Sequence, residues 1–236
     1  MKTLRFKKSA IAAAVGIAGM FCVGSAGAYT WSLGSCAVGA LNGCGTSFVG
    51  ATTVDFNSPG LGPFPLPSGS DFNYTGGAVV NGTSAGNHAP PSGDTSNYYS
   101  VGPFDGTANG DTFSGNFNYT GAPLLYYFGF NYSSPDLYNS VDIMLGNTIL
   151  QTFTGAQLAT PLGFPANGDQ ATSRYLNVVA DNAGEFFDHV RFNSTANAFE
   201  TDNHAFAAIP EPSEYAMLLA GLGLMGFIAR RRTQAA

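Results

Sequence analysis

Acidic side chains are the groups best suited to chemistry in this chain of 236 residues. Between residues 29 and 209 the sequence holds 13 Asp and Glu, against two Arg and no Lys. Three of these acids, Asp188, Glu200 and Asp202, lie near the end of that stretch together with Asn203. Oxygen ligands from neighbouring loops suit Ca²⁺, although no EF-hand spacing is present. We therefore predict a protein without a cofactor, unless these acids gather around calcium instead of lying solvated at strand ends.

The same composition bears on partners and on catalysis. A stretch with a formal charge of 2 − 13 = −11 cannot neutralise phosphates, which argues against nucleic acid as a partner. The motifs of serine hydrolases, zinc proteases and phosphate-binding loops do not occur in the sequence. A pair of carboxylates could still hydrolyse glycans, but spacing in sequence does not bring two acids together in space. We predict that the protein is not an enzyme.

Aromatic residues offer a second kind of site. Sugar rings stack on exposed aromatic side chains that have polar neighbours, and Tyr127, Tyr132 and Tyr138 are candidates for such a glycan platform. The alternative is that these rings lie in the core or in cross-strand pairs, because aromatic residues favour strands in any case.

The first 28 residues read as an export signal. A basic start is followed by an apolar run over 10–23 and by Ala26-Gly27-Ala28, whose small residues suit signal peptidase. Cleavage after Ala28 would make Tyr29 the first residue of the mature protein. The exported chain would then keep Cys36 and Cys44, and an oxidising compartment favours a disulfide between them. A metal site at these two thiols is the weaker alternative, because Cys22 would leave with the signal peptide and the exported chain would have no further Cys or nearby His.

The body of the chain shows almost no helical periodicity. Gly, Asn, Ser, Thr and Pro interrupt short runs of aromatic and β-branched residues, which predicts one all-β domain, an antiparallel β-sandwich. Gly146 and Asn147 predict a hairpin turn. Residues 57–111 predict long loops around short strands, or partial disorder. The predicted strands cover 112–119, 124–132, 141–145, 148–153, 175–180, 189–192 and 198–207.

The end of the chain holds the most specific pattern. The triplet Pro210-Glu211-Pro212 precedes an apolar run from Tyr215 to Ala229, and the cluster Arg230, Arg231 and Arg232 follows it. A helix over that run would rise about 22 Å, which is short for a hydrocarbon core of about 30 Å. We predict a short transmembrane helix that holds the protein at the inner membrane briefly, with the arginines on the cytoplasmic side. The two prolines predict an extended segment just before it.

This tail resembles the PEP-CTERM sorting signals of Gram-negative bacteria. The resemblance implies that a membrane-embedded exosortase recognises Pro210, Glu211 and Pro212 and cleaves there. Cleavage would release the protein or transfer it to the cell surface, a process usually linked to exopolysaccharide production.

A second resemblance covers residues 97–206. Tyr127-Phe128-Gly129-Phe130, Asp136 and Tyr138-Asn139 are similar to the YFGLYWGS-D-YN core of one group of exosortase-dependent surface proteins, and Arg174-Tyr175-Leu176-Asn177 agrees with the same group. Asn131 stands where that group commonly has Trp. The resemblance implies location and a jelly-roll type of β-sandwich, as in many carbohydrate-binding modules, but no chemistry.

Three segments and one leading function follow. We predict a signal peptide over 1–28, a β-sandwich over 29–207 and a sorting signal over 208–236. The leading hypothesis is an exported, exosortase-processed protein of the cell surface or extracellular matrix, associated with exopolysaccharide or biofilm. The alternatives are a carbohydrate-binding module, assisted or not by calcium, and a glycan hydrolase.

Overall fold

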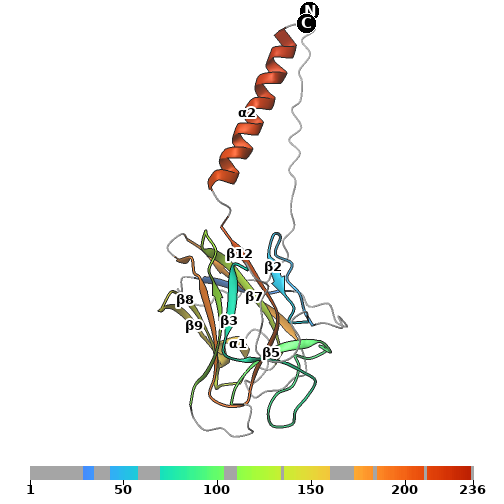
Figure 1. Ribbon diagram of the computed structural model, residues 1–236, viewed down its shortest axis with the longest axis vertical. Coiled ribbons are helices and arrows are strands. Elements are labelled where there is room, and N and C mark those ends of the chain that lie inside the picture. The colour runs from blue at the N-terminus through green and yellow to red at the C-terminus, as the bar shows by residue number, and fades with distance from the viewer. Residues whose placement is uncertain are drawn as a thin grey trace, which may run out of the picture.

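Two antiparallel β-sheets form the body of the protein, and one helix projects from it (Figure 1). The computed structural model describes residues 29–34, 43–57, 70–103, 111–133, 136–159, 173–182, 185–209 and 212–234. The predicted signal peptide and its cleavage-site residues Ala26 and Ala28 lie outside these ranges. The prediction of an antiparallel all-β body is confirmed for the described residues.

The larger sheet has seven strands within the described residues. Along the sheet the strands are β1 (Tyr29–Gly34), β10 (Arg174–Ala180), β7 (Leu125–Tyr132), β12 (Phe199–Ala208), β5 (Asn97–Val101) and β4 (Ala78–Asn81), while β2 (Thr52–Val54) pairs with part of β12. The central strand β7 is buried along nearly its whole length. This agrees with the predicted central strand over the apolar run 124–132, because a strand covered on both faces reads as a continuous apolar stretch.

The smaller sheet has five strands in the described part of the chain. Their order is β3 (Phe72–Thr75), β6 (Phe113–Tyr119), β11 (His189–Ser194), β8 (Asn139–Leu145) and β9 (Thr148–Thr154). Gly146 adopts a φ of +55° in the turn between β8 and β9, as the hairpin prediction requires. A short helix, α1 (Gly155–Ala159), follows β9.

The strands β5 to β12 pair in a nested way. The outermost two, β5 and β12, pair with each other. Inside them β6 pairs with β11, β7 with β10, and β8 with β9. The chain therefore crosses repeatedly between the two sheets, so that each sheet takes alternate pairs of strands.

One aromatic core joins the two sheets. Phe117 of β6 meets Phe128 of β7 with ring centroids 5.1 Å apart. In the same way Phe192 of β11 meets Phe130 of β7 at 5.2 Å. Each buried Phe of this kind contributes about 1.5–3 kcal/mol relative to an exposed one. Packing between the sheets therefore stabilises the body in addition to the strand pairing within each sheet.

The opposite face of the seven-stranded sheet is covered as well. Phe48, from the segment 43–51, stacks on Tyr127 of β7 with centroids 3.9 Å apart and planes 11° apart. The Tyr127 hydroxyl lies 2.6 Å from Thr46 Oγ1 and donates to Asn177 Oδ1 at 2.7 Å. Alternate residues of β7 thus face the aromatic core and this second layer, which we call the outer layer.

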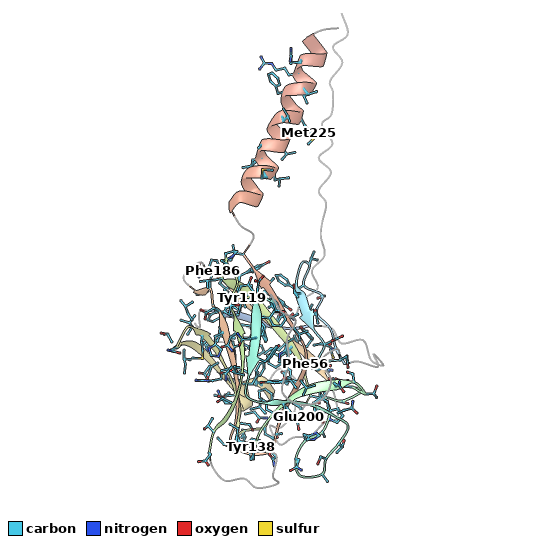
Figure 2. All side chains as sticks on the ribbon, in the orientation of Figure 1. Phe56, Tyr119, Tyr138, Phe186, Glu200 and Met225 are labelled. Carbon is cyan, nitrogen blue, oxygen red and sulfur yellow. The ribbon has the colours of Figure 1, made fainter. Side chains whose placement is uncertain are left out.

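The helix α2 (Pro212–Gln234) stands apart from the sheets (Figure 1). Figure 2 shows Met225 on this helix, well away from the body. The helical prediction over the apolar run is confirmed, but the predicted extended conformation is wrong at Pro212, which is the first residue of α2. A proline suits that position because the first turn of a helix needs no amide donor there. Pro210 and Glu211 lie outside the described residues.

Candidate functional site

An irregularity in β12 separates two buried ionisable residues. In the pairing with β7, Asp202 faces Asn131, and the next paired residue is Ala205, opposite Gly129. The intervening Asn203 has a φ of +49°, in the left-handed region. Two residues of β12 therefore oppose one of β7, which is a β-bulge and re-aims the side chains that follow. As a result, Asp202 faces the outer layer while His204 faces the aromatic core.

His204 is a fully satisfied core residue. It has no exposed surface, and its ring stacks on Phe192 with centroids 4.9 Å apart. Its Nδ1 lies 2.8 Å from the Tyr74 hydroxyl, and its Nε2 lies 2.8 Å from Thr201 Oγ1. Burial lowers the pKa of His204 to about 3 because charging the ring in the core is unfavourable. His204 is therefore a neutral structural side chain rather than an acid or a base.

Asp202 differs from His204 in its hydrogen bonding. It also has no exposed surface, yet neither of its carboxylate oxygens accepts a hydrogen bond. Asp94, which is 4% exposed, is close enough to share a hydrogen bond with it if one of the two carries a proton. Burial, that hydrogen bond and the charges of Asp94 and Asp55 raise the pKa of Asp202 to about 10, although the nearby backbone amide of Asn203 opposes the shift.

Asn131 completes this cluster, which we call the outer-layer acid site (Asp94, Asn131 and Asp202). Asn131 Oδ1 accepts a hydrogen bond from Ser173 Oγ at 2.7 Å. Its Nδ2 is buried and has no hydrogen-bond partner, and the same is true of Asp94 Oδ2. The other oxygen of Asp94, Oδ1, accepts from the backbone and the hydroxyl of Ser96 at 2.8 and 2.5 Å. Polar atoms without partners thus gather at one place in the interior.

The segment at Gly43 and Cys44 closes the site. A Cβ added to Gly43 would lie 2.3 Å from Asn131 Nδ2 and 3.2 Å from Asp94 Oδ2. Gly43 also has a φ of +72°, which favours glycine. The next residue, Cys44, is buried, and its carbonyl accepts a hydrogen bond from Asn203 Nδ2 at 3.2 Å. Only a residue without a side chain fits above the acids.

Glu200 is a third buried acid on the same face of β12. It is 7% exposed, and its Oε1 accepts a hydrogen bond from the Ala89 amide at 3.0 Å. Burial and the charge of Asp136 raise the pKa of Glu200 to about 7, while the Ala89 amide opposes the shift. Glu200 lies in the half of the body remote from α2 (Figure 2). Unlike Asp202, Glu200 has a hydrogen-bond partner within the protein, the Ala89 amide.

The predicted calcium ligands are only partly brought together. Glu200 and Asp202 lie on β12, whereas Asp188 precedes β11 in the other sheet and its Oδ1 accepts from the Gly146 amide at 2.8 Å. Among the described residues, no group of three or more His, Cys, Asp or Glu is arranged to hold a metal ion. The predicted trio is therefore wrong as a set, because sequence proximity does not place residues of two different sheets together.

The predicted glycan platform is also corrected by the fold. Tyr127 and Tyr132 have no exposed surface, and their hydroxyls bond inside the protein, that of Tyr132 to the Leu158 carbonyl at 2.7 Å. Tyr138 is half-buried and donates to the Asn197 carbonyl at 2.8 Å. The first two rings therefore cannot stack on a sugar. They pack as strand aromatics in the core and the outer layer, which was the alternative interpretation of the sequence.

Sequence reasoning missed two members of the outer-layer acid site. Asp94 sits in a Gly/Pro/Ser-rich stretch, where an acid reads as a turn residue, and Asn131 lies within an apolar run. No signal in the sequence pairs them with Asp202.

The predicted disulfide is supported at one end, because Cys44 is disulfide-bonded. Cys36 lies outside the described residues, so the pairing stays a prediction.

The helix α2 exposes its apolar side chains on all sides. Eight of them are between 44% and 75% exposed: Met217, Leu218, Leu219, Leu222, Leu224, Met225, Phe227 and Ile228. Arg231 lies over the Phe227 ring at 5.8 Å, and Arg230 and Arg231 are exposed. The Arg232 side chain is outside the described part. Measured over the described residues, no helix is both long and apolar enough to cross a membrane.

The comparison with family models identifies this end of the chain. Residues 208–232 match the model of the PEP-CTERM protein-sorting motif. The chain carries a PEP-CTERM sorting motif. The match spans the Pro-Glu-Pro box, the apolar run and the arginine cluster, as the sequence predicted. It supports export and exosortase-dependent sorting to the cell surface.

The PEP-CTERM motif also implies processing by an exosortase and a membrane-associated intermediate. The comparisons with curated proteins and with solved structures each found no significant match. The narrower resemblance of residues 97–206 to one group of exosortase-dependent proteins therefore stays a prediction.

Proposed function

We propose that this protein is a non-enzymatic component of the extracellular matrix or cell surface, released there by exosortase cleavage near Pro210-Glu211-Pro212. The PEP-CTERM match over residues 208–232 carries the proposal. The position of the motif also supports this proposal, because the Pro-Glu-Pro box lies just after β12, the last strand, which ends at Ala208. Cleavage at the box would leave the whole β body intact.

The exposed surface of α2 fits this role. Eight of its apolar side chains are 44–75% exposed, so in water they favour a covering surface. In the membrane-associated intermediate, lipid or the exosortase would cover them, and Arg230 to Arg232 would remain on the cytoplasmic side. Signal peptidase would act at Ala28 before this stage, and the exosortase afterwards.

The acids support a non-enzymatic role. A glycosidase needs two carboxyl groups that flank a bound sugar, with water or substrate between them. Asp94 and Asp202, two carboxyl groups within hydrogen-bond reach of each other, are 4% and 0% exposed and lie beneath Gly43. A polysaccharide cannot reach it.

The sorting part is tested in the producing bacterium. Replacing Pro210, Glu211 and Pro212 by alanine is expected to leave the full-length exported chain in the membrane fraction, whereas the wild-type body appears outside the cell at lower mass. Thr233→Ala with Gln234→Ala is the control, because these residues lie beyond the matched range. Equal release of the triple variant would contradict exosortase processing at this box.

A carbohydrate-binding module is the second candidate. The nested pairing of β5 to β12 supports a jelly roll, an architecture that many lectin domains use. The test is retention of the released protein on the cell's own exopolysaccharide, with calcium and with EDTA. Retention under either condition supports binding to the matrix glycan. Loss of the protein from the matrix in both conditions would leave the sorting proposal standing and remove the glycan partner.

A further inference from the structure

The fold leaves several buried polar atoms without hydrogen-bond partners. Among the described residues, six buried side-chain nitrogen or oxygen atoms have no hydrogen bond. Four of the six belong to the outer-layer acid site: Asp94 Oδ2, both oxygens of Asp202, and Asn131 Nδ2. Native proteins pair the large majority of such groups, so four in one place call for a missing partner.

The described part of the β body places no Lys or Arg where it acts on the charge of Asp202. Between residues 29 and 209 the only basic residues apart from three His are Arg174 and Arg191. Arg191 forms an ion pair with Asp142 at 2.8 Å in the other sheet. Arg174 lies opposite Tyr132 and donates to the Ser173 carbonyl at 2.9 Å. A buried acid pair without a counter-ion is unfavourable, because each charge loses its hydration without compensation.

We propose that Asp94, Asp202 and Asn131 bind one divalent cation, with Ca²⁺ as the best match, beneath the Gly43–Cys44 segment. A proton shared by the two carboxyl groups would satisfy one oxygen of each and leave the other oxygen of Asp202 and the Asn131 amide alone. A cation engages all three unpaired carboxylate oxygens at once.

The geometry of Asn131 accommodates the same ion. Turning its amide by 180° keeps the shape of the side chain and retains the contact with Ser173, with donor and acceptor exchanged. The amide oxygen then takes the place of Nδ2, on the side of Gly43 where Asp94 Oδ2 also lies. Carboxylate and amide oxygens are the ligands that Ca²⁺ prefers, and backbone carbonyls or water complete its six to eight positions.

The number of charged ligands sets the expected affinity of the site for Ca²⁺. Two carboxylates rather than three are present, and the described residues hold no larger His, Cys, Asp and Glu group for a metal. Few charged ligands correspond to weak extracellular calcium modules, with Kd values of about 10⁻⁴–10⁻³ M. The ion would join β12, β7 and the loop of Asp94 to the segment 43–44, and so tie the outer layer to the sheet. This inference does not depend on the sorting proposal.

The test uses the full-length chain purified in detergent and stripped with EGTA. Isothermal titration with CaCl₂ in 0.15 M salt is expected to show about one saturable site per chain. Calcium at about 100 times Kd is expected to raise Tm by roughly 5–10 °C. Asp202→Asn and Asp94→Asn should each weaken calcium binding at least tenfold, whereas Asp71→Asn, an exposed acid with the same charge change, should alter it less than twofold.

One further variant separates a cation site from a shared proton. Asn131→Asp adds a third carboxylate, so a cation site predicts tighter calcium binding by several-fold. A hydrogen-bonded acid pair predicts lower stability with no calcium response. No saturable binding by the wild-type chain, or equal binding by Asp202→Asn, overturns the proposal even if the other variants fail to fold.

Discussion

The two faces of β12 differ in whether their buried ionisable residues have hydrogen-bond partners. His204 faces the aromatic core, and both of its ring nitrogens have partners. Asp202 lies two positions earlier on the other face, equally buried, and neither of its oxygens has a partner. Burial alone therefore does not identify a site. A buried group with complete hydrogen bonding supports the fold, and one without it indicates where a ligand is expected.

The two faces also respond to pH with opposite signs. The pKa of His204 falls to about 3 in the folded protein, so its contribution to stability is present above its ordinary pKa and is lost as the pH falls toward 3. Tyr74 and Tyr99 are the titratable groups that face it. The pKa of Asp202 rises to about 10, so its contribution is present at low pH and is lost as the pH rises toward 10.

The largest expected effect comes from the core face. Phe192→Ala should lower the free energy of unfolding by about 3–5 kcal/mol, because it removes the ring that stacks on His204 and leaves a cavity between the sheets. Urea denaturation followed by far-UV circular dichroism measures the loss. Ile149→Ala, at a side chain 49% exposed on β9, is the control and should cost less than about 1 kcal/mol. Similar losses at both positions would mean that the core does not lie between the sheets.

The next effect concerns Asp202 without calcium. In EGTA, the free energy of unfolding should fall by about 2–3 kcal/mol between pH 7 and pH 9, because the unfolded chain has lost one proton that the folded acid pair retains. Asp94 and Asp55 are the charged groups that face Asp202 and oppose its ionisation. Asp202→Asn should remove this slope. A wild-type profile that is flat over this range would show that the two acids are not paired.

An effect of similar size is expected at the segment that covers the acid site. Gly43→Ala should cost about 2–3 kcal/mol, since the new methyl group would lie 2.3 Å from Asn131 Nδ2 in addition to the strain of a positive φ. Gly50→Ala is a matched control, because Gly50 has a φ of +85° but no atom within 4 Å of the added carbon. That control should cost about 1 kcal/mol. Thermal unfolding of both variants measures the difference, and equal costs would contradict close packing above the acids.

The smallest effect probes the partners of His204. Tyr74→Phe removes the hydroxyl that lies 2.8 Å from Nδ1 and leaves that nitrogen buried without a partner. The expected loss is about 1–2 kcal/mol at pH 7, measured by urea denaturation. An unchanged stability would indicate that the core supplies another partner, and the contrast with Asp202 would weaken accordingly.

Much of the secondary structure follows from local sequence. The runs 124–132, 141–145 and 148–153 became β7, β8 and β9 because apolar residues, β-branched residues and a Gly-Asn turn agree on the same structure. The Gly/Pro/Ser-rich region 57–111 was harder to predict. It holds β3, β4 and β5, whose short strands gain stability from neighbours in the sheet rather than from their own composition.

The candidate sites also differ in whether local sequence was enough to predict them. The sorting motif is contiguous, so the order of Pro-Glu-Pro, apolar run and arginines could be recognised without a fold. The glycan platform was wrong at Tyr127 and Tyr132 because a tyrosine has the same sequence signature whether it stacks on a sugar or on Phe48. The metal trio was wrong because Asp188 belongs to the other sheet.

The sorting motif and the β strands of the body could be predicted from the sequence, because contiguous residues and local alternation carry both signals. Which acids meet depends on the fold. Asp94 and Asp202 are 108 positions apart in the chain, and the fold brings them within hydrogen-bond reach of each other. A contact between distant residues is set by the topology of the sheets, and no short-range pattern encodes it.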